Sequence, residues 1–131
     1  MSKPKKVVQA MYAAYGSGNM EALKNTLSED IQWIYHGTDE IEHSGVYRGK
    51  KGVTEFFSNV NAHIDYLDFQ PNQFIAEGNL VVVLGNEKQK IKKNNEILEQ
   101  EWVQVYTVKN ELITRMEEFS NTSHAVKLHR K

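Results

Sequence analysis

Residues 113–121 read ITRMEEFSN, and two adjacent glutamates in this stretch determine how the last strand of the chain must be oriented. Glu117 and Glu118 lie between Met116 and Phe119, in a segment whose composition is typical of a strand. Neighbouring side chains of a strand point to opposite faces of the sheet. If one face covers a core, only one glutamate can face solvent and the other carboxyl group must point inward. The alternation by itself permits either orientation.

The preceding stretch, residues 97–109, reads ILEQEWVQVYTVK and predicts a strand with two dissimilar faces. One face is aromatic with a single amide and the other is small and mostly β-branched, because Trp102, Gln104 and Tyr106 alternate with Val103, Val105 and Thr107. Aromatic rings beside an amide are typical of a ligand-binding wall. The β-branched face would form an apolar patch that a second copy can cover, which predicts a homodimer.

Helical periodicity comes first in the chain and strand periodicity comes last. Helices are expected from Ser2 and Pro4 to near Gly16, at residues 20–27 and at residues 53–64. Strands are expected at residues 30–37, 66–76, 79–92, 97–109 and 111–121, with an irregular segment at 38–52. Residues 123–131 are either a short tail or a last helix. This order predicts an α+β fold in which helices pack on one face of an antiparallel, strongly curved sheet and leave a cone-shaped pocket.

Length and composition restrict the class of protein. The 131 residues predict one domain, 1–131. No cysteine is present, which excludes thiolate metal sites, iron–sulfur clusters and cysteine nucleophiles. A formal net charge of -1 argues against nucleic acid or a membrane surface as a partner. The one local cluster of lysines, in KQKIKK at residues 88–93, is interpreted as a solvated strand edge. The sequence shows neither a membrane span nor the apolar core of a signal peptide, so a cytoplasmic location is expected.

Two longer stretches carry a resemblance to a known family. HSGVYRGKKGVTEFF, residues 43–57, and EWVQVYTVKNELITRMEEFSN, residues 101–121, resemble the SnoaL-like polyketide cyclase group. These proteins are relatives of limonene epoxide hydrolase and ketosteroid isomerase within the nuclear transport factor two-like superfamily. The resemblance implies a cone-shaped α+β barrel, usually dimeric, whose pocket is adapted to different chemistries by a few polar residues.

The resemblance also assigns an orientation to the last strand. Many relatives carry a motif similar to F-R-E-Y-x-D there, whose glutamate matches Glu118 and whose aspartate matches Asn121. This match places Glu118 in the pocket and Glu117 outside. Burial would raise the pKa of Glu118 into a range useful for proton transfer. In the alternative interpretation Glu118 pairs with a hydroxyl or a basic side chain and only closes the open end of the barrel. Asn121 can hold a carbonyl group but cannot shuttle a proton.

His36, at the end of the first expected strand, is a second candidate for acid–base work because histidine titrates near neutral pH. Strand alternation places it opposite Trp33 and Tyr35 unless the chain bends before Gly37, which favours a structural role. The other predicted pocket residues supply apolar walls, polar anchors and a closing side chain at Tyr47. They are Trp33, Tyr35, Tyr47, Phe57, Trp102, Gln104, Tyr106, Met116 and Asn121.

Two functions follow from these features. The first is a cofactor-free isomerase, cyclase or epoxide hydrolase-like enzyme that acts on a small hydrophobic molecule, with Glu118 as acid or base. The second is a ligand-binding or protein-association module of the same fold without chemistry. The sequence has no phosphate loop, dinucleotide fingerprint or nucleophile elbow, so no cofactor is predicted. His43, His63, His124 and His129 lack paired metal-ligand spacing, so no metal is predicted.

Overall fold

The computed structural model describes residues 3–131. Its helices are α1 (Lys3–Gly16), α2 (Met20–Asn25), α3 (Gly49–His63) and α4 (Thr122–His129). Its strands are β1 (Leu27–Tyr35), β2 (Gly45–Arg48), β3 (Ile64–Glu77), β4 (Leu80–Ile91), β5 (Ile97–Lys109) and β6 (Leu112–Ser120). The predicted α+β class is confirmed. Ser2, part of the expected start of the first helix, lies outside the described residues.

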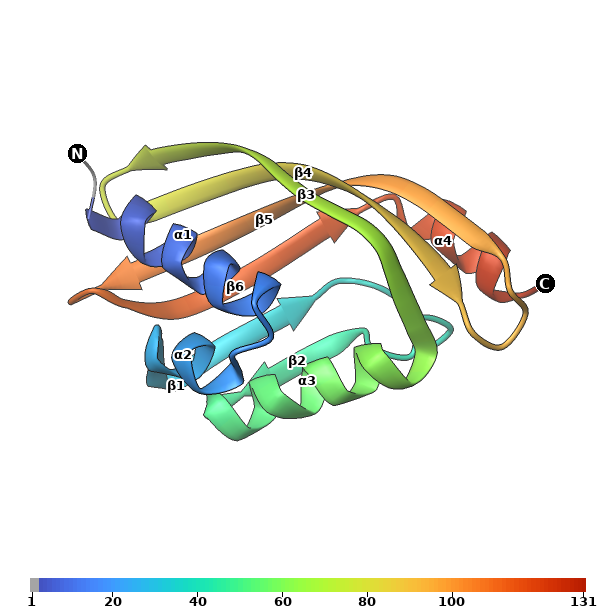
Figure 1. Cartoon of the computed structure of the whole chain (residues 1–131), viewed down its shortest axis with the longest axis horizontal. Coiled ribbons are helices and arrows are strands. Elements are labelled where there is room, and N and C mark those ends of the chain that lie inside the picture. Colours follow the sequence, from blue (N-terminus) through green and yellow to red (C-terminus); the bar gives the residue numbers. More distant parts are fainter. Residues whose placement is uncertain (1–2) are drawn as a thin grey trace.

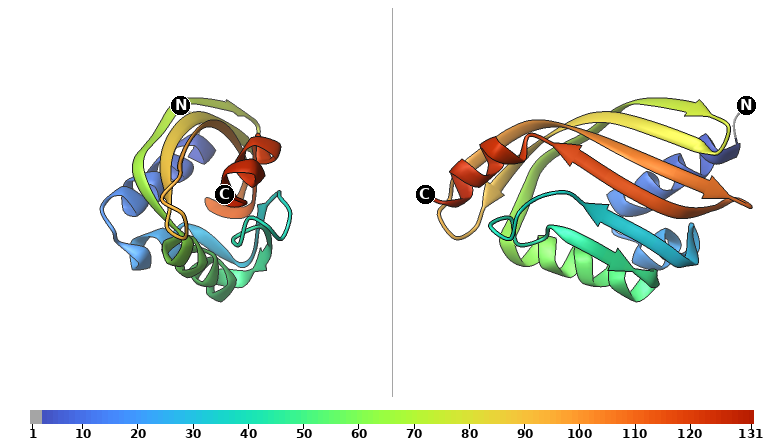
Figure 2. Two further views of the ribbon diagram at one scale, coloured as in Figure 1. Left: turned by 90° about the vertical axis from the view of Figure 1, so that its right-hand side faces the viewer. Right: turned by 180° about the vertical axis from the view of Figure 1, so that it is seen from behind.

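The strands form one curved mixed sheet of six strands in the order β2-β1-β6-β5-β4-β3. β1 and β6 run parallel, and the other neighbours run antiparallel. The long strands curl around α1 and α3, which lie on the concave face (Figures 1 and 2). The sheet is open, with β2 and β3 as its edges, rather than a closed barrel.

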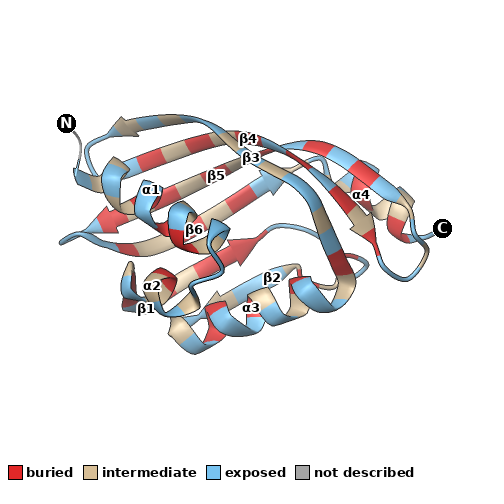
Figure 3. Cartoon of the chain, viewed as in Figure 1, coloured by how far each residue is buried: buried red, intermediate tan, exposed pale blue. Residues whose placement is uncertain are grey.

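The helices pack as their apolar spacing predicts. α1 buries Val8, Met11 and Ala14, which recur three residues apart on one helical face. α3 likewise buries Val53, Phe56 and Val60. Strand alternation is equally regular in β5, where every second residue from Leu98 to Val108 is buried (Figure 3). The concave face of the sheet and the inner faces of these helices therefore share one core.

Two local expectations are wrong. The segment expected to be irregular contains β2, which pairs with β1 through only four residues. A strand of four mostly exposed residues leaves no periodic signal in the sequence. The lysines at 88–93 do not mark a sheet edge either, because the strand residues among them belong to β4, which lies between β3 and β5. The C-terminal residues form α4, whose Ala125 and His129 are buried.

Among the described residues 3–131, the chain contains no helix of the length and apolarity needed to cross a membrane.

Candidate functional site

Glu118 faces the concave side of the sheet, and Glu117 faces outward. β6 sits between β1 and β5, so the Glu118 side chain projects toward the helices and is only 6% exposed. Its Oε1 accepts a hydrogen bond of 2.6 Å from the Gln104 amide on β5. Burial, and next the neighbouring carboxyl of Glu87, raise the pKa of Glu118 to about 8, against a smaller opposing effect of the Gln104 hydrogen bond. The protonated acid therefore predominates at neutral pH.

A chain of hydroxyl groups links this carboxyl group to α1. The Gln104 carbonyl accepts hydrogen bonds from the Tyr106 hydroxyl, at 2.7 Å, and from the Tyr12 hydroxyl. The two phenol oxygens, of Tyr106 and Tyr12, lie 3.0 Å apart. Burial raises the pKa of both tyrosines, so both hydroxyls stay protonated. The Gln104 side chain thus links the two phenol hydroxyls to the Glu118 carboxyl group through hydrogen bonds.

Tyr12, on α1, lines the interior cavity and is a site residue that the sequence analysis did not name. The hydroxyl of an inward-facing tyrosine needs a polar partner when it is buried. Tyr12 lies at the helical spacing of the inward-facing residues, so this need for a polar partner could have identified it from the sequence.

Aromatic side chains surround this polar group. The Trp102 ring stacks on Phe69 with centroids 4.9 Å apart and an interplanar angle of 14°, and it also stacks on Tyr12 at 6.3 Å. Trp33 lies 5.7 Å from Phe57, measured between ring centroids. The wall is apolar apart from Gln104, Glu118 and the phenol groups, an environment in which a carboxyl group is poorly solvated.

The space left between these side chains is small. The interior cavity has a volume of about 20 Å³, room for about one water molecule. It is lined by Met11, Tyr12, Tyr15, Trp33, Phe56, Phe57, Tyr66, Phe69, Gln104 and Glu118. The expected unfilled cone is therefore wrong for this conformation, because rings from α1, α3 and β3 occupy it. Tyr15 and Phe57 also line a surface pocket of about 270 Å³, so these two rings separate the interior from the outside.

The predicted pocket residues divide into three groups. Trp33, Phe57, Gln104 and Glu118 line the interior cavity. A buried layer around it is formed by four others, none of which lines the cavity: Tyr35, Trp102, Tyr106 and Met116. The remaining three, His36, Tyr47 and Asn121, lie elsewhere.

His36 lies on the outer face of the sheet. Its Nε2 is 2.8 Å from Glu117 Oε2, and its ring stacks on Phe119 at 4.8 Å between centroids. The hydrogen bond with His36 is the main cause that lowers the pKa of Glu117. Strand alternation persists to the end of β1, so the His36 side chain does not reach the Glu118 carboxyl group. The structure places these two candidate acid–base side chains on opposite faces of the sheet.

Asn121 and Tyr47 have structural contacts. The Asn121 side chain caps α4 by accepting a hydrogen bond of 3.2 Å from the His124 amide. The Tyr47 hydroxyl donates to the His43 carbonyl at 3.1 Å, and the ring packs edge-on against Phe56. Neither lines the interior cavity, since β6 has ended before Asn121 and β2 lies at the sheet edge.

Glu87 on β4 is a second buried carboxyl group that sequence reasoning missed. It is 3% exposed, and its Oε2 accepts hydrogen bonds from the Gln89 amide, at 2.6 Å, and from the Gln100 amide. Burial raises the pKa of Glu87 to about 7, despite these two amide donors. Alternation along β4 places Glu87 in phase with buried Val81 and Val83, and this phase was the available signal. Among the described residues, neither Glu87 nor Glu118 makes an ion pair with a basic side chain.

Histidines gather near α4 but do not form a metal centre. Glu42 lies 3.3 Å from His129 Nδ1 and 3.8 Å from His63 Nε2. Within the part of the chain that the structure describes, no three His, Asp or Glu side chains are arranged to hold a metal ion.

This open, curved six-stranded sheet wrapped around helices is the fold seen in solved structures of NTF2-like proteins. The sequence profile of the SnoaL-like domain matches residues 8–116, and the chain belongs to this family. Comparison with curated proteins finds no significant match.

Solved structures similar to this chain include an NTF2-like protein from Burkholderia xenovorans, with 25% identity and a TM-score of 0.89 over 97% of this chain and 95% of that one. An NTF2-like protein of unknown function from Burkholderia pseudomallei is 23% identical, with a TM-score of 0.90 over the whole of both chains. TerC, co-crystallized with polyporic acid, is 22% identical, with a TM-score of 0.87 over 99% of this chain and 100% of that one.

Proposed function

We propose that the chain binds a small hydrophobic carbonyl-bearing or cyclic molecule in its interior and that Glu118 exchanges a proton with it. The observation that carries this proposal is a buried carboxyl group with no basic partner among the described residues, held by one amide at 2.6 Å. A buried carboxyl group without a counter-ion reduces stability, and such groups are concentrated at functional sites.

The chemistry follows from the protonation state. A carboxylic acid with a pKa of about 8 can donate its proton to a carbonyl or epoxide oxygen near neutral pH. Its conjugate base can remove a hydrogen from a carbon beside a carbonyl group. Tyr12 and Tyr106 keep neutral hydroxyls that donate to the Gln104 carbonyl, and a substrate oxygen would receive one of these hydrogen bonds by taking the place of that carbonyl. No cofactor enters this scheme.

A ligand can enter the interior cavity only if the Tyr15 and Phe57 rings, which separate it from the outside, move. Their rings lie 5.2 Å apart, between α1 and α3, and both are half-buried. Rotation of these rings would join the interior to the surface pocket of about 270 Å³. TerC, which has a similar fold, was co-crystallized with polyporic acid, and this supports ligand binding by the fold.

The test is proton exchange at an activated carbon. We expect the protein to accelerate deuterium incorporation beside the carbonyl of 2-tetralone in D₂O, followed by proton NMR. Glu118→Gln should reduce this acceleration on the order of 100-fold, with similar 2-tetralone affinity, because an amide cannot carry the proton. Glu117→Gln is the matched control, since it makes the same change one residue away on the outer face. Equal rates for wild type and Glu118→Gln would refute the role of Glu118.

The small interior cavity favours a second candidate, a non-catalytic association module of the same fold. A volume of about 20 Å³ leaves no room for a substrate without movement of the rings. This candidate predicts neither exchange nor binding of 2-tetralone by the wild-type protein, so the same assay distinguishes the two.

A further inference from the structure

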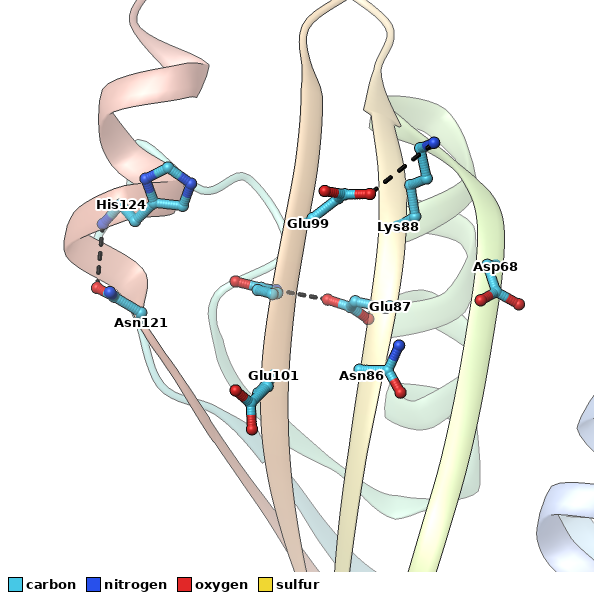
Figure 4. Close-up of a pocket in the computed structure, with 9 residues that line it drawn as sticks. Asp68, Asn86, Glu87, Lys88, Glu99, Glu101, Asn121 and His124 are labelled. Carbon is cyan, nitrogen blue, oxygen red and sulfur yellow. Dashed lines mark hydrogen bonds and ion pairs between the residues drawn. The ribbon is translucent and has the colours of Figure 1, made fainter.

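Cavity size does not identify a binding site in this molecule. A surface cavity of about 590 Å³ lies at the hairpin end of β4 and β5, beside α4 (Figure 4). It is lined mainly by exposed side chains, among them Lys88 and Glu99, which already pair at 3.9 Å between Nζ and Oε1. Water and salt screen such surface charges. The interior cavity is much smaller, but Glu118 and Gln104 in its lining are buried, and a low dielectric strengthens their interactions with a ligand.

Trp33 brings a hydrogen-bond donor to the lining of the interior cavity. The residue is 3% exposed, and its indole Nε1 has no hydrogen-bond partner among the described residues. Within the described chain, Trp33 is the only residue lining this cavity that has a fully buried polar side-chain atom without a partner. A buried N–H group without an acceptor is unfavourable and rare in folded proteins. We therefore expect its acceptor to come from a molecule that occupies the cavity.

The sheet register places Trp33 beside the buried acid. Trp33 pairs with Met116 on the parallel neighbour β6, and Glu118 lies two residues further along that strand. Residues two apart on a strand share a face, so Trp33 and Glu118 are diagonal neighbours on the concave face. Both line a space of about 20 Å³, which is room for about one water molecule. One small group of a ligand can therefore contact both side chains.

The proposed proton exchange needs a donor at this position. When the Glu118 carboxylate removes a proton from the carbon beside a carbonyl group, the C–H electron pair forms a C=C bond and the carbonyl π pair moves to oxygen. Negative charge thus develops on the oxygen while Glu118 is engaged at the carbon. The hydroxyls of Tyr12 and Tyr106 already donate to the Gln104 carbonyl. The Trp33 N–H can bind the oxygen without the loss of a hydrogen bond within the described chain.

We propose that the Trp33 indole N–H binds the substrate oxygen and stabilises the negative charge that develops there, while Glu118 exchanges the proton at the adjacent carbon. A donor that is fixed by packing before the reaction needs no reorganisation when the charge appears. This inference rests on the proposed function, because it supplies the oxygen-binding donor of the same interior site. It narrows the substrate class to ketones with an acidic hydrogen on the carbon beside the carbonyl group.

NMR of the ¹⁵N-labelled wild-type protein tests the donor independently of catalysis. The chain has two tryptophans and so gives two indole N–H signals, which Trp33→Phe assigns. 2-Naphthol has the ring skeleton of 2-tetralone with its oxygen in the enol form, and naphthalene lacks the oxygen. We expect the Trp33 N–H proton to lie further downfield in the 2-naphthol complex than in the naphthalene complex, because only the first ligand can accept a hydrogen bond. Trp102 Nε1 is also buried without a partner but does not line the cavity, so its signal is the internal control.

Two results of this titration would contradict the inference. The same Trp33 shift with naphthalene as with 2-naphthol would overturn the assignment of Trp33 alone. No binding of 2-naphthol would overturn it together with the ligand site on which it rests.

Exchange kinetics test the role of the donor in the reaction. Trp33→Phe should lower the maximal rate of deuterium incorporation into 2-tetralone on the order of 100-fold, as removal of an oxyanion donor does. Its affinity for naphthalene should be similar to that of the wild type. If Trp33→Phe does not fold, replacement of Trp33 by β-(3-benzothienyl)alanine keeps the bicyclic ring and puts sulfur in place of the N–H group. This variant should slow the exchange by a similar factor.

The two proposals can fail separately. Exchange that is as fast in the benzothienyl variant as in the wild type, but slow in Glu118→Gln, would overturn only the assignment of Trp33. Exchange that Glu118→Gln does not slow would refute the role of Glu118, and the Trp33 signal in the 2-naphthol complex would still report on the donor.

Discussion

Glu87 and Glu118 have pKa values of about 7 and about 8, because burial disfavours their ionised forms. An acid whose pKa is raised by folding binds its proton more tightly in the native state. It therefore adds stability below the pKa of the unfolded chain, and that stability is lost as pH rises through the native pKa. For this pair the loss extends from about pH 4.5 to beyond pH 8.

The buried histidines act in the opposite direction at lower pH. Burial lowers the pKa of His43 to about 4, and burial also lowers the pKa of His129. A histidine of this kind adds stability above its unfolded pKa near 6.5, which is lost as pH falls toward the native value. The histidine contributions become constant about one pH unit above 6.5, so the buried carboxyl groups can be observed without this interference from about pH 7.5.

We predict that the free energy of unfolding falls between pH 7.5 and pH 9, by on the order of 1 kcal/mol per pH unit for each titrating carboxyl group. Urea unfolding at a series of pH values measures this slope. Glu118→Gln should flatten it. Glu117→Gln should leave it unchanged, because the pKa of Glu117 is lowered and its titration lies below this range. A wild-type slope of zero would contradict the raised pKa values.

Single residues show what sequence patterns can and cannot predict. The inward position of Glu118 follows from strand alternation once the match to the family fixes the orientation, and the structure places it there. Glu87 was missed because five charged or amide residues around it suggested a solvated strand. Whether an inward acid meets an amide or a base depends on the neighbouring strand, and only the β4–β5 register brings Gln100 opposite Glu87.

Among the elements, β4 and β5 are joined by a close approach that requires glycine. The Trp102 ring crosses β4 at Gly85, its cross-strand partner. A Cβ atom at Gly85 would lie 2.3 Å from Trp102 Cζ2 and 2.5 Å from the backbone oxygen of Gln70. The absence of a side chain at Gly85 thus lets Trp102 lie flat and stack on Phe69.

Gly85→Ala is predicted to destabilise the protein by about 1–3 kcal/mol, the usual cost of overpacking. The Trp102 ring must move, because the Gln70 backbone on the other side of the added methyl group is held in the sheet. Urea unfolding gives the stability, and near-ultraviolet circular dichroism reports on Trp102. Gly16→Ala is the control, since no atom lies within 4 Å of the added Cβ there. An unchanged midpoint and spectrum for Gly85→Ala would show that Trp102 does not need this position.

Elements were predictable to the extent that they repeat a pattern. α1, α3 and the five longer strands have enough residues for a periodic signal, whereas the four residues of β2 do not. The filling of the interior was not predictable, because it depends on side-chain rotamers. Tyr12, Tyr15 and Phe69 come from two separate elements, and only their packed positions show that their rings occupy the same space.

For the whole molecule, the outer face of the sheet supports the predicted homodimer. Val103, Val105 and Thr107 face away from the core, as the alternation of β5 predicts, and Val82 and Leu84 pair beside them on β4. They form a contiguous apolar patch that a second copy can cover. Beyond the hairpin end of the patch lie Lys88 and Lys90 on β4 and Glu99 and Glu101 on β5, and Lys88 faces Glu99 within the same chain. A twofold arrangement that sets β4 against β5 would pair these opposite charges.

We therefore predict a dimer at tens of micromolar protein, measured by sedimentation velocity. Val105→Lys should convert it to a monomer, because a buried ammonium group at the centre of an apolar interface has no partner. Val46→Lys makes the same change on β2, at an edge of the sheet, where Val46 is 53% exposed. It should leave the dimer intact. Circular dichroism of both variants separates loss of association from loss of fold. A monomeric wild type would exclude the predicted dimer. Equal dissociation by both variants would show that the contact between the two copies does not lie at Val105.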